Sequence, residues 1–288
     1  MLICQQTEHL GAIYPLEEAL DMIKKAGFDA ADLSLFDLEK NPRWMSENYK
    51  EEAKKLGEYA RSIGLPILQA HAPFSFKYKE RDHEEIFQIV YRGVEIAALS
   101  GAKKIVVHPL HYSDYEYHEE EWFEINMAYY PRFKPLCEEY GVQICVENMW
   151  RTNKLRKVID HDTCSRPEEF IRYLDTLNAD GKNHFTACLD IGHMALVGEK
   201  PDRMIEMLGD RIGALHTHDN NYRDDSHTLP GLGKMPMELV FSSLKKVGYQ
   251  GILTLEADNF LTRLPKELLP SALSFMAENA RYYANLCE

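Results

Sequence analysis

Short apolar runs alternate with longer amphipathic segments along the whole chain. Each short run has the length and composition of a buried strand, and the alternation is typical of parallel strands joined by crossover helices. The runs predict eight strands, which cover residues 2–6, 29–35, 66–71, 103–108, 142–147, 184–190, 211–218 and 251–257. We therefore expect an α/β protein built as a single (β/α)8 TIM barrel.

The segments between the strands carry apolar residues at three- and four-residue spacing, which predicts helices with one buried face. The clearest of them cover residues 15–27, 47–64, 86–101 and 237–248. Each ends at a glycine, which can adopt the left-handed conformation that closes a helix before the next strand. Longer connections follow the strands at 108–120, 148–167 and 219–236. We expect these loops on the face where such barrels carry their chemistry.

Length and composition agree with one barrel domain over residues 1–288, because 288 residues exceed the roughly 250 that such a barrel needs. The formal net charge of -13 disfavours nucleic acid as a partner, since it repels a phosphate backbone. Six scattered cysteines without a C-x-x-C pair indicate buried thiols in a reducing compartment. No signal-peptide pattern and no membrane-spanning apolar stretch is found. We expect a soluble, cytoplasmic protein without a membrane partner.

Four acidic or imidazole residues stand at the tails of predicted strands, namely Glu147, Asp190, His216 and Glu256. The carboxyl ends of the strands of a parallel barrel meet at one mouth, so we expect these side chains to lie together. Charged groups buried at one mouth are costly unless a cation neutralises them. The pattern therefore predicts a divalent-metal site.

Further polar residues follow the same or neighbouring strands, namely His71, His108, His193, Asp225 and His227. Taken singly, a strand-end histidine can be a satisfied core residue, and the two loop residues can cap turns. Together with the four residues above, they make purely structural roles less favourable and favour a metal site.

Seven motifs occur in order through most of the chain: HAPF, VVHP, ICVEN, CLDIGHMAL, ALHTHDN, D-x-H-x-x-P-G-x-G and GYQGILTLEAD. With them, the chain resembles the xylose isomerase-like TIM-barrel superfamily. That superfamily includes sugar isomerases and epimerases of the D-tagatose 3-epimerase kind, and also endonuclease IV. The resemblance implies that Glu147, Asp190, His216 and Glu256 bind one divalent ion of Mn, Mg, Co, Zn or Fe.

The resemblance further implies an isomerase or epimerase that acts on a sugar, a sugar phosphate or a keto-polyol. A hydroxyketone binds the ion through two oxygens, and the ion stabilises the enediolate left when a carbon-bound proton is removed. Glu147 and Glu256 are then the catalytic groups, because they flank the substrate and can take and return the proton. Substrate contacts are expected from His71, His108, His193, Arg223 and Trp150.

A second function fits the same residues. In endonuclease IV, up to three zinc ions are held by residues that correspond here to His71, His108, Glu147, Asp190, His193, His216, Asp225, His227 and Glu256. Asp225 and His227 are additional metal ligands in that case. The motif contexts depart from the nuclease, because LDIGH replaces a D-T-C-H form, HTHDN replaces H-x-N-D-S-K, and APFSFKY follows the first histidine. These departures and the net charge favour sugar chemistry over abasic-site cleavage.

The chain also departs from the tagatose-type epimerases. Asn153 stands where they carry a further glutamate, and Arg223 lies one place later than a strict match. The basic stretch 151–157 could grip a phosphate or carboxylate group of the substrate, or could be a solvated surface. A non-catalytic sugar-binding or metal-binding barrel is a third alternative, which the retained pair of glutamates disfavours. The identity of the sugar and the formation of a homo-oligomer stay open.

Overall fold

The structure is a computed structural model that describes residues 1–74, 76, 81–110 and 115–287. Part of the APFSFKY segment and part of the loop after residue 110 therefore lie outside the described residues. Eight parallel strands form one sheet in the order β10-β1-β2-β3-β4-β5-β8-β9. Their bounds are β1 (Leu2–Gln6), β2 (Ala30–Ser34), β3 (Ile67–His71), β4 (Lys104–Val107), β5 (Gln143–Glu147), β8 (Phe185–Asp190), β9 (Ile212–His216) and β10 (Ile252–Leu255). Each lies within a predicted run.

The sheet closes on itself just beyond the end of β9. Thr217 pairs with Leu255 in a parallel bridge. The Thr217 amide donates to the carbonyl of Thr254 at 2.8 Å, and the Glu256 amide donates to the carbonyl of Thr217 at 3.1 Å. This short seam completes the ring, so the prediction of a (β/α)8 barrel is confirmed.

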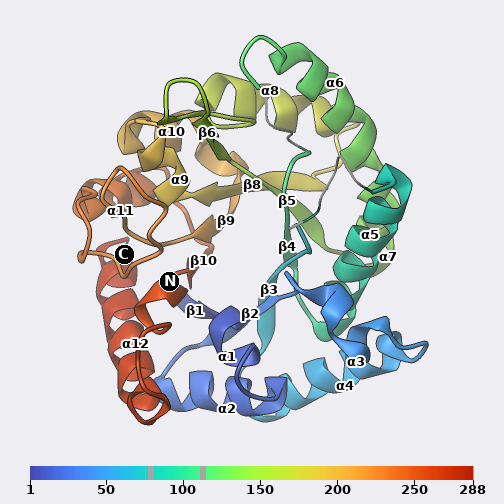
Figure 1. The fold of residues 1–288 in the computed structure, drawn as a ribbon, viewed down its shortest axis with the longest axis vertical. Coiled ribbons are helices and arrows are strands. Elements are labelled where there is room, and N and C mark those ends of the chain that lie inside the picture. Colours follow the sequence, from blue (N-terminus) through green and yellow to red (C-terminus); the bar gives the residue numbers. More distant parts are fainter. Residues whose placement is uncertain (75, 77–80, 111–114, 288) are drawn as a thin grey trace.

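Helices surround the ring of strands, as Figure 1 shows in a view along the barrel. The α-helices are α1 (Glu8–Gly11), α2 (Leu16–Ala26), α3 (Pro42–Met45), α4 (Tyr49–Ser62), α5 (His83–Ser100), α6 (Glu119–Tyr129), α7 (Lys134–Tyr140), α8 (Pro167–Leu177), α9 (Ile191–Leu196), α10 (Pro201–Leu208), α11 (Met237–Lys246) and α12 (Leu269–Leu286). The 3-10 helices are η1 (Leu38–Lys40), η2 (Tyr130–Phe133), η3 (Gly209–Arg211), η4 (Asp258–Phe260) and η5 (Lys266–Leu268). Helices α2 and α5 end at Gly27 and Gly101, whose φ angles of 103° and 115° confirm the predicted left-handed stops.

The inside of the barrel explains why polar residues gather at one mouth. Four buried side chains on neighbouring strands form a small cluster separate from the main core, namely Val106, Cys145, Cys188 and Ala214. Side chains two residues apart on a strand point to the same face. Glu147, Asp190 and His216 each follow a member of this cluster by two residues, so they project into the lumen one step nearer the mouth.

Segment 148–167, expected as a loop, contains a two-stranded antiparallel hairpin of β6 (Trp150–Asn153) and β7 (Val158–His161). Its arginines are already paired. Arg156 Nη2 lies 3.1 Å from Glu116 Oε2 and 2.5 Å from Asp160 Oδ2, and Arg151 lies 3.5 Å from the same glutamate. The basic stretch is therefore partly neutralised by the protein itself. In the described part of the chain, no helix has the combined length and apolarity needed to cross a membrane.

Candidate metal centre

Glu147, Asp190, His216 and Glu256 converge at the barrel mouth, with one ligand atom from each within 4.8 Å of the others. His216 Nδ1 lies 3.0 Å from Glu147 Oε1, 3.0 Å from Glu256 Oε2 and 4.0 Å from Asp190 Oδ2. All four residues are buried. One nitrogen and three carboxylate oxygens thus surround a common point, on strands that are far apart in the sequence.

Local structure holds Asp190 in place. The residue caps the start of α9, because its carboxylate accepts a hydrogen bond from the His193 amide at 2.7 Å. Asn148, just after β5, joins the two strand ends: its side chain accepts from the Asp190 amide at 2.8 Å and donates to the Asp190 carbonyl at 2.9 Å. The ends of β5 and β8 are therefore fixed relative to each other.

The charges of this group are strongly coupled. Burial raises the pKa of Glu147 and Glu256, but neighbouring imidazoles together outweigh burial and hold both pKa values well below the ordinary range. His216 acts on both glutamates, with His108 beside Glu147 and His227 near Glu256. Burial opposes protonation of His216, yet the Cys188 thiol and the two glutamates raise its pKa well above the ordinary value. The imidazole therefore carries a proton that a cation would displace.

A second group lies beside the first and centres on Asp225. Its Oδ2 accepts a hydrogen bond from Trp150 Nε1 at 3.1 Å and lies 3.1 Å from His227 Nε2 and 3.3 Å from His193 Nε2. Burial raises the pKa of Asp225, but the two imidazoles hold it well below the ordinary range. Burial lowers the pKa of His227, whereas Asp225 raises it, with a net pKa of about 10. The pKa of His193 is also raised, by Asp190 and Asp225 against the effect of burial.

The remaining predicted histidines flank Glu147 on its other side. His108 Nε2 lies 2.9 Å and His71 Nε2 lies 3.4 Å from Glu147 Oε2. The carbonyl of Ala72 lies 2.7 Å from His71 Nδ1, so this nitrogen carries a hydrogen and donates. The Phe36 ring packs edge-on against His71, with the ring centroids 4.7 Å apart.

A cavity of about 330 Å3 opens above these groups. Its walls combine the two glutamates and the surrounding histidines with the apolar side chains of Phe74, Met149 and Trp150. Arg223 is exposed and does not line this cavity, although the sequence suggested a substrate contact there. The centre thus has a polar floor of acidic and imidazole groups and partly apolar walls.

The family model of the xylose isomerase-like TIM barrel matches residues 20–279. The chain belongs to this family. Among relatives of this xylose isomerase-like barrel, an uncharacterized protein of Methanocaldococcus jannaschii is 29% identical over 220 residues, which are 73% of this chain and 71% of that protein. An inosose isomerase of Bacillus velezensis is 22% identical over 248 residues, covering 84% of this chain and 82% of the isomerase.

Solved structures share the fold over nearly the whole length of this xylose isomerase-like barrel. A D-tagatose 3-epimerase-like protein gives a TM-score of 0.71 at 22% identity and covers 96% of this chain and 99% of its own. A 3-keto-D-glucoside 4-epimerase from E. coli gives a TM-score of 0.70 at 18% identity, with coverage of 96% and 99%. At these identities, the likeness shows the fold.

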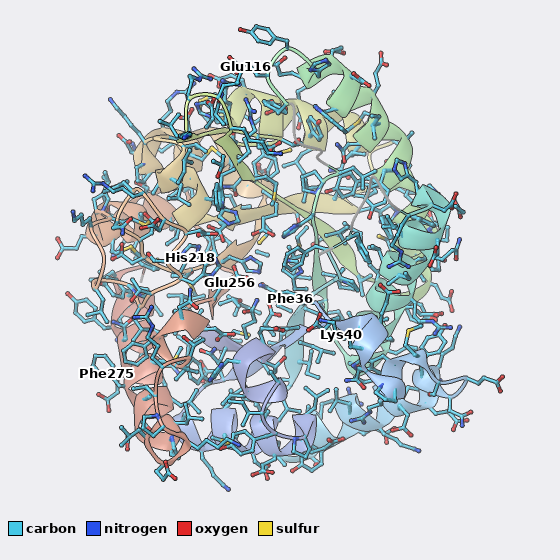
Figure 2. The ribbon with its side chains drawn as sticks, in the orientation of Figure 1. Phe36, Lys40, Glu116, His218, Glu256 and Phe275 are labelled. Atoms are coloured by element: carbon cyan, nitrogen blue, oxygen red, sulfur yellow. The ribbon has the colours of Figure 1, made fainter. Side chains whose placement is uncertain are left out.

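The xylose isomerase-like barrel also places residues at the centre that the sequence did not single out. His218 Nε2 lies 3.1 Å and 3.2 Å from the two carboxylate oxygens of Asp190, and Gln6 Nε2 donates to Glu256 Oε1 at 3.0 Å. Figure 2 shows His218 and Glu256 near the middle of the ring of strands. The signal for His218 was its position two residues beyond His216, on the same side of an extended chain.

Proposed function

We propose that the protein is a divalent-metal-dependent isomerase or epimerase that acts on a sugar or a sugar-like keto-polyol. The observation that carries the proposal is the convergence of Glu147, Asp190, His216 and Glu256 beneath the cavity. The volume of the cavity falls in the range of about 300–1,000 Å3 common for small-molecule sites. An inosose isomerase and several sugar epimerases stand among the similar proteins, which supports this class of reaction.

The residues present fit a divalent ion. Three buried carboxylates and one imidazole concentrate negative charge away from solvent, and a divalent cation offsets that cost. Carboxylate oxygens with one imidazole suit Mn2+, Mg2+, Co2+, Fe2+ or Zn2+. Glu147, Asp190, His216 and Glu256 would hold the ion. Once bound, it supplies positive charge that stabilises the negative charge formed when a carbon-bound proton leaves the substrate.

The two glutamates are the proton carriers in this proposal. Glu147 stands at the end of β5 and Glu256 just after β10, and each lies 3.0 Å from His216 Nδ1. Their lowered pKa values keep both ionised, so either can accept a proton at a carboxylate oxygen. Gln6 donates to Glu256 Oε1 and so leaves Oε2 turned toward the centre. One glutamate removes a proton, and the other returns one on the opposite face for an epimerisation.

The remaining predicted residues would contact the substrate. His193 lies at the wall of the cavity, and its Nδ1 lies 2.9 Å from the carbonyl of Asn148, so the ring is held with Nε2 turned toward Asp225. Trp150 offers an apolar surface while its indole nitrogen is engaged with Asp225. Phe74 and Met149 line the same space with apolar surface, and a bound substrate that displaces water there would strengthen the electrostatic interactions inside it.

The test is a screen in D2O followed by proton NMR. The full chain is stripped with a chelator, reloaded with Mn2+, Mg2+, Co2+ or Zn2+, and incubated with ketoses, hydroxypyruvate and inososes. We expect loss of a carbon-bound proton signal only after reloading. Glu256→Gln should reduce the exchange rate by about 10²- to 10⁴-fold, whereas the exposed Glu267→Gln should leave it unchanged. Unaltered exchange in Glu256→Gln, or exchange in the stripped protein, would contradict the proposal.

Abasic-site cleavage by an endonuclease IV-like trinuclear zinc site is the second candidate function. Three groups of side chains that could hold a metal ion favour it, two of which share Glu147 and His216. They are the four proposed ligands; His71 with Glu147 and His216; and His193, His218, Asp225 and His227. Asp225 Oδ1 is buried and lacks a hydrogen-bond partner among the described residues. Metal analysis should give one ion per chain, and an abasic duplex should stay intact. Three zinc ions per chain together with efficient nicking would favour the nuclease instead.

A further inference from the structure

His218 contacts both carboxylate oxygens of the proposed ligand Asp190 from outside the ligand set. The side chain has no solvent exposure, and its Nε2 lies 3.1 Å from Asp190 Oδ1 and 3.2 Å from Oδ2. Oδ1 also accepts the hydrogen bond from the His193 amide at 2.7 Å. His218 Nε2 is thus nearly equidistant from the two oxygens, whereas the His193 amide contacts Oδ1, and Oδ2 lies 4.0 Å from His216 Nδ1. Together these two donors fix the orientation of the carboxylate, with Oδ2 on the side of His216.

Hydrogen bonding defines the tautomer of His218. Its Nδ1 is buried and has no hydrogen-bond partner among the described residues, whereas Nε2 faces a carboxylate. The hydrogen therefore lies on Nε2, where it can be donated to Asp190. The ring plane is set by His227, which stacks on it with the centroids 4.1 Å apart and the planes 5° from parallel.

The ring fits in this position because residue 192 has no side chain. A Cβ atom on Gly192 would lie 1.9 Å from His218 Cε1, 2.4 Å from Nε2 and 2.6 Å from Nδ1. The three nearest atoms to that added carbon all belong to this one ring. Gly192 lies in helix α9 and is not among the glycines with positive φ, so the backbone does not require glycine there. The requirement is one of space.

We propose that Gly192 and His218 form a matched pair whose role is to position the Asp190 carboxylate for the metal ion. His218 is thus a positioning residue that acts through Asp190, and the lack of a side chain at Gly192 leaves the space that the His218 ring occupies. The inference rests on the proposed metal site. It also links two departures from the nuclease pattern, because Gly192 stands at the cysteine of D-T-C-H and His218 at the asparagine of H-x-N-D-S-K. A smaller residue at one position accompanies a larger residue at the other, and the two meet in space.

The arrangement has two consequences that can be measured separately. Loss of the His218 donor leaves the Asp190 carboxylate held by the His193 amide alone among the described residues. Loss of such a supporting hydrogen bond typically weakens metal affinity by about 10- to 100-fold. Gly192→Ala should weaken binding in the same direction, because the new methyl group displaces the ring. In a His218→Ala background the same methyl group enters empty space. There it should be harmless or stabilising, since alanine favours a helix more than glycine does.

The experiment is a double-mutant cycle with the full chain, using His218→Ala, Gly192→Ala and the combined variant. Mn2+ binding is measured by isothermal titration calorimetry, and thermal unfolding is measured on the metal-free proteins. We expect both single variants to bind Mn2+ more weakly, and the combined variant to bind no worse than His218→Ala. Gly192→Ala should lower the melting temperature of the parent but not that of His218→Ala. The exposed His118→Ala is the control and should match the parent.

Three outcomes would overturn the inference. Unchanged Mn2+ affinity in His218→Ala removes the positioning role, and additive effects of the two substitutions remove the pairing. Loss of one bound ion per chain in His218→Ala, with the affinity for a remaining ion unchanged, makes this residue a direct ligand of a second ion with Asp225 and His227. Absence of any divalent-ion binding by the parent chain is a different failure, because it overturns the proposed function and with it the role of Asp190. In that case the melting temperatures still report whether the two residues are sterically coupled.

Discussion

Asp219→Asn should loosen the loop that carries Asp225 and His227. Asp219 has no solvent exposure, and its carboxylate accepts four backbone hydrogen bonds. Oδ1 accepts from Asn220 at 2.7 Å and Met235 at 3.0 Å, while Oδ2 accepts from Gly231 and Gly233, both at 3.0 Å. Asparagine offers one carbonyl oxygen, so in either orientation its amino group faces two amide donors that then have no acceptor.

The cost follows from that count. Hydrogen bonds to a charged acceptor contribute about 1.5–3 kcal/mol each, so the loss of two raises the free energy of the ordered loop by about 3–6 kcal/mol. Each 1.4 kcal/mol corresponds to about tenfold in an equilibrium constant. If the loop opens locally, its amides should therefore exchange with solvent about 100-fold faster or more. The amides of Gly231, Gly233 and Met235 are the most direct reporters.

Hydrogen exchange read by mass spectrometry or NMR is the assay, and it uses the folded protein. The matched control is Asp224→Asn in the same loop, because Asp224 is exposed and accepts from the Asn221 side chain at 3.1 Å. That change should leave the exchange rates near those of the parent. The reasoning is refuted if Asp219→Asn folds and its three reporter amides exchange less than about tenfold faster than in the parent.

Further predictions concern the ion and pH. Mn2+ at 100 times its dissociation constant should raise the free energy of unfolding by about 2.7 kcal/mol, measured by thermal unfolding with and without a chelator; no shift would contradict the metal site. The raised pKa of His216 keeps the imidazole protonated at pH 7 without metal, so Mn2+ binding should release about one proton. Calorimetry in buffers of different ionisation enthalpy measures this release, and equal binding enthalpies in all buffers would argue against it. Burial raises the pKa of Glu169 from 4.5 to about 7. Between these values the folded state binds more protons than the unfolded state, so the free energy of unfolding should fall by about 3 kcal/mol as pH rises. Asp258 and Asp32 also have pKa values raised by burial, to about 7 and about 6, and add to the slope. Glu169→Gln should therefore reduce the slope relative to the parent in urea unfolding measured across that range, and an unchanged slope would contradict the contribution of Glu169.

Much of the barrel could be predicted because buried parallel strands appear as continuous apolar runs, which local composition reveals. The four proposed ligands were predictable for the same reason, since each directly follows such a run. The hairpin of β6 and β7 was not, because its strands are short, largely polar and held by Glu116 from another loop. The role of His218 depends on a close approach to Gly192, which sequence spacing does not reveal. Arg223 was expected near the substrate, but the structure leaves it exposed.

The short pairing between β9 and β10 means that an ion at the centre would also stabilise the closure of the barrel. In the described part of the chain, backbone hydrogen bonds join β9 and β10 only through Thr217, and His216 and Glu256 stand on the two sides of this bridge. An ion bound by both His216 and Glu256 would cross-link β9 and β10, which are joined by few backbone hydrogen bonds. Removal of the ion should therefore separate β9 from β10 first, while the other seven strand pairs of the barrel stay hydrogen-bonded.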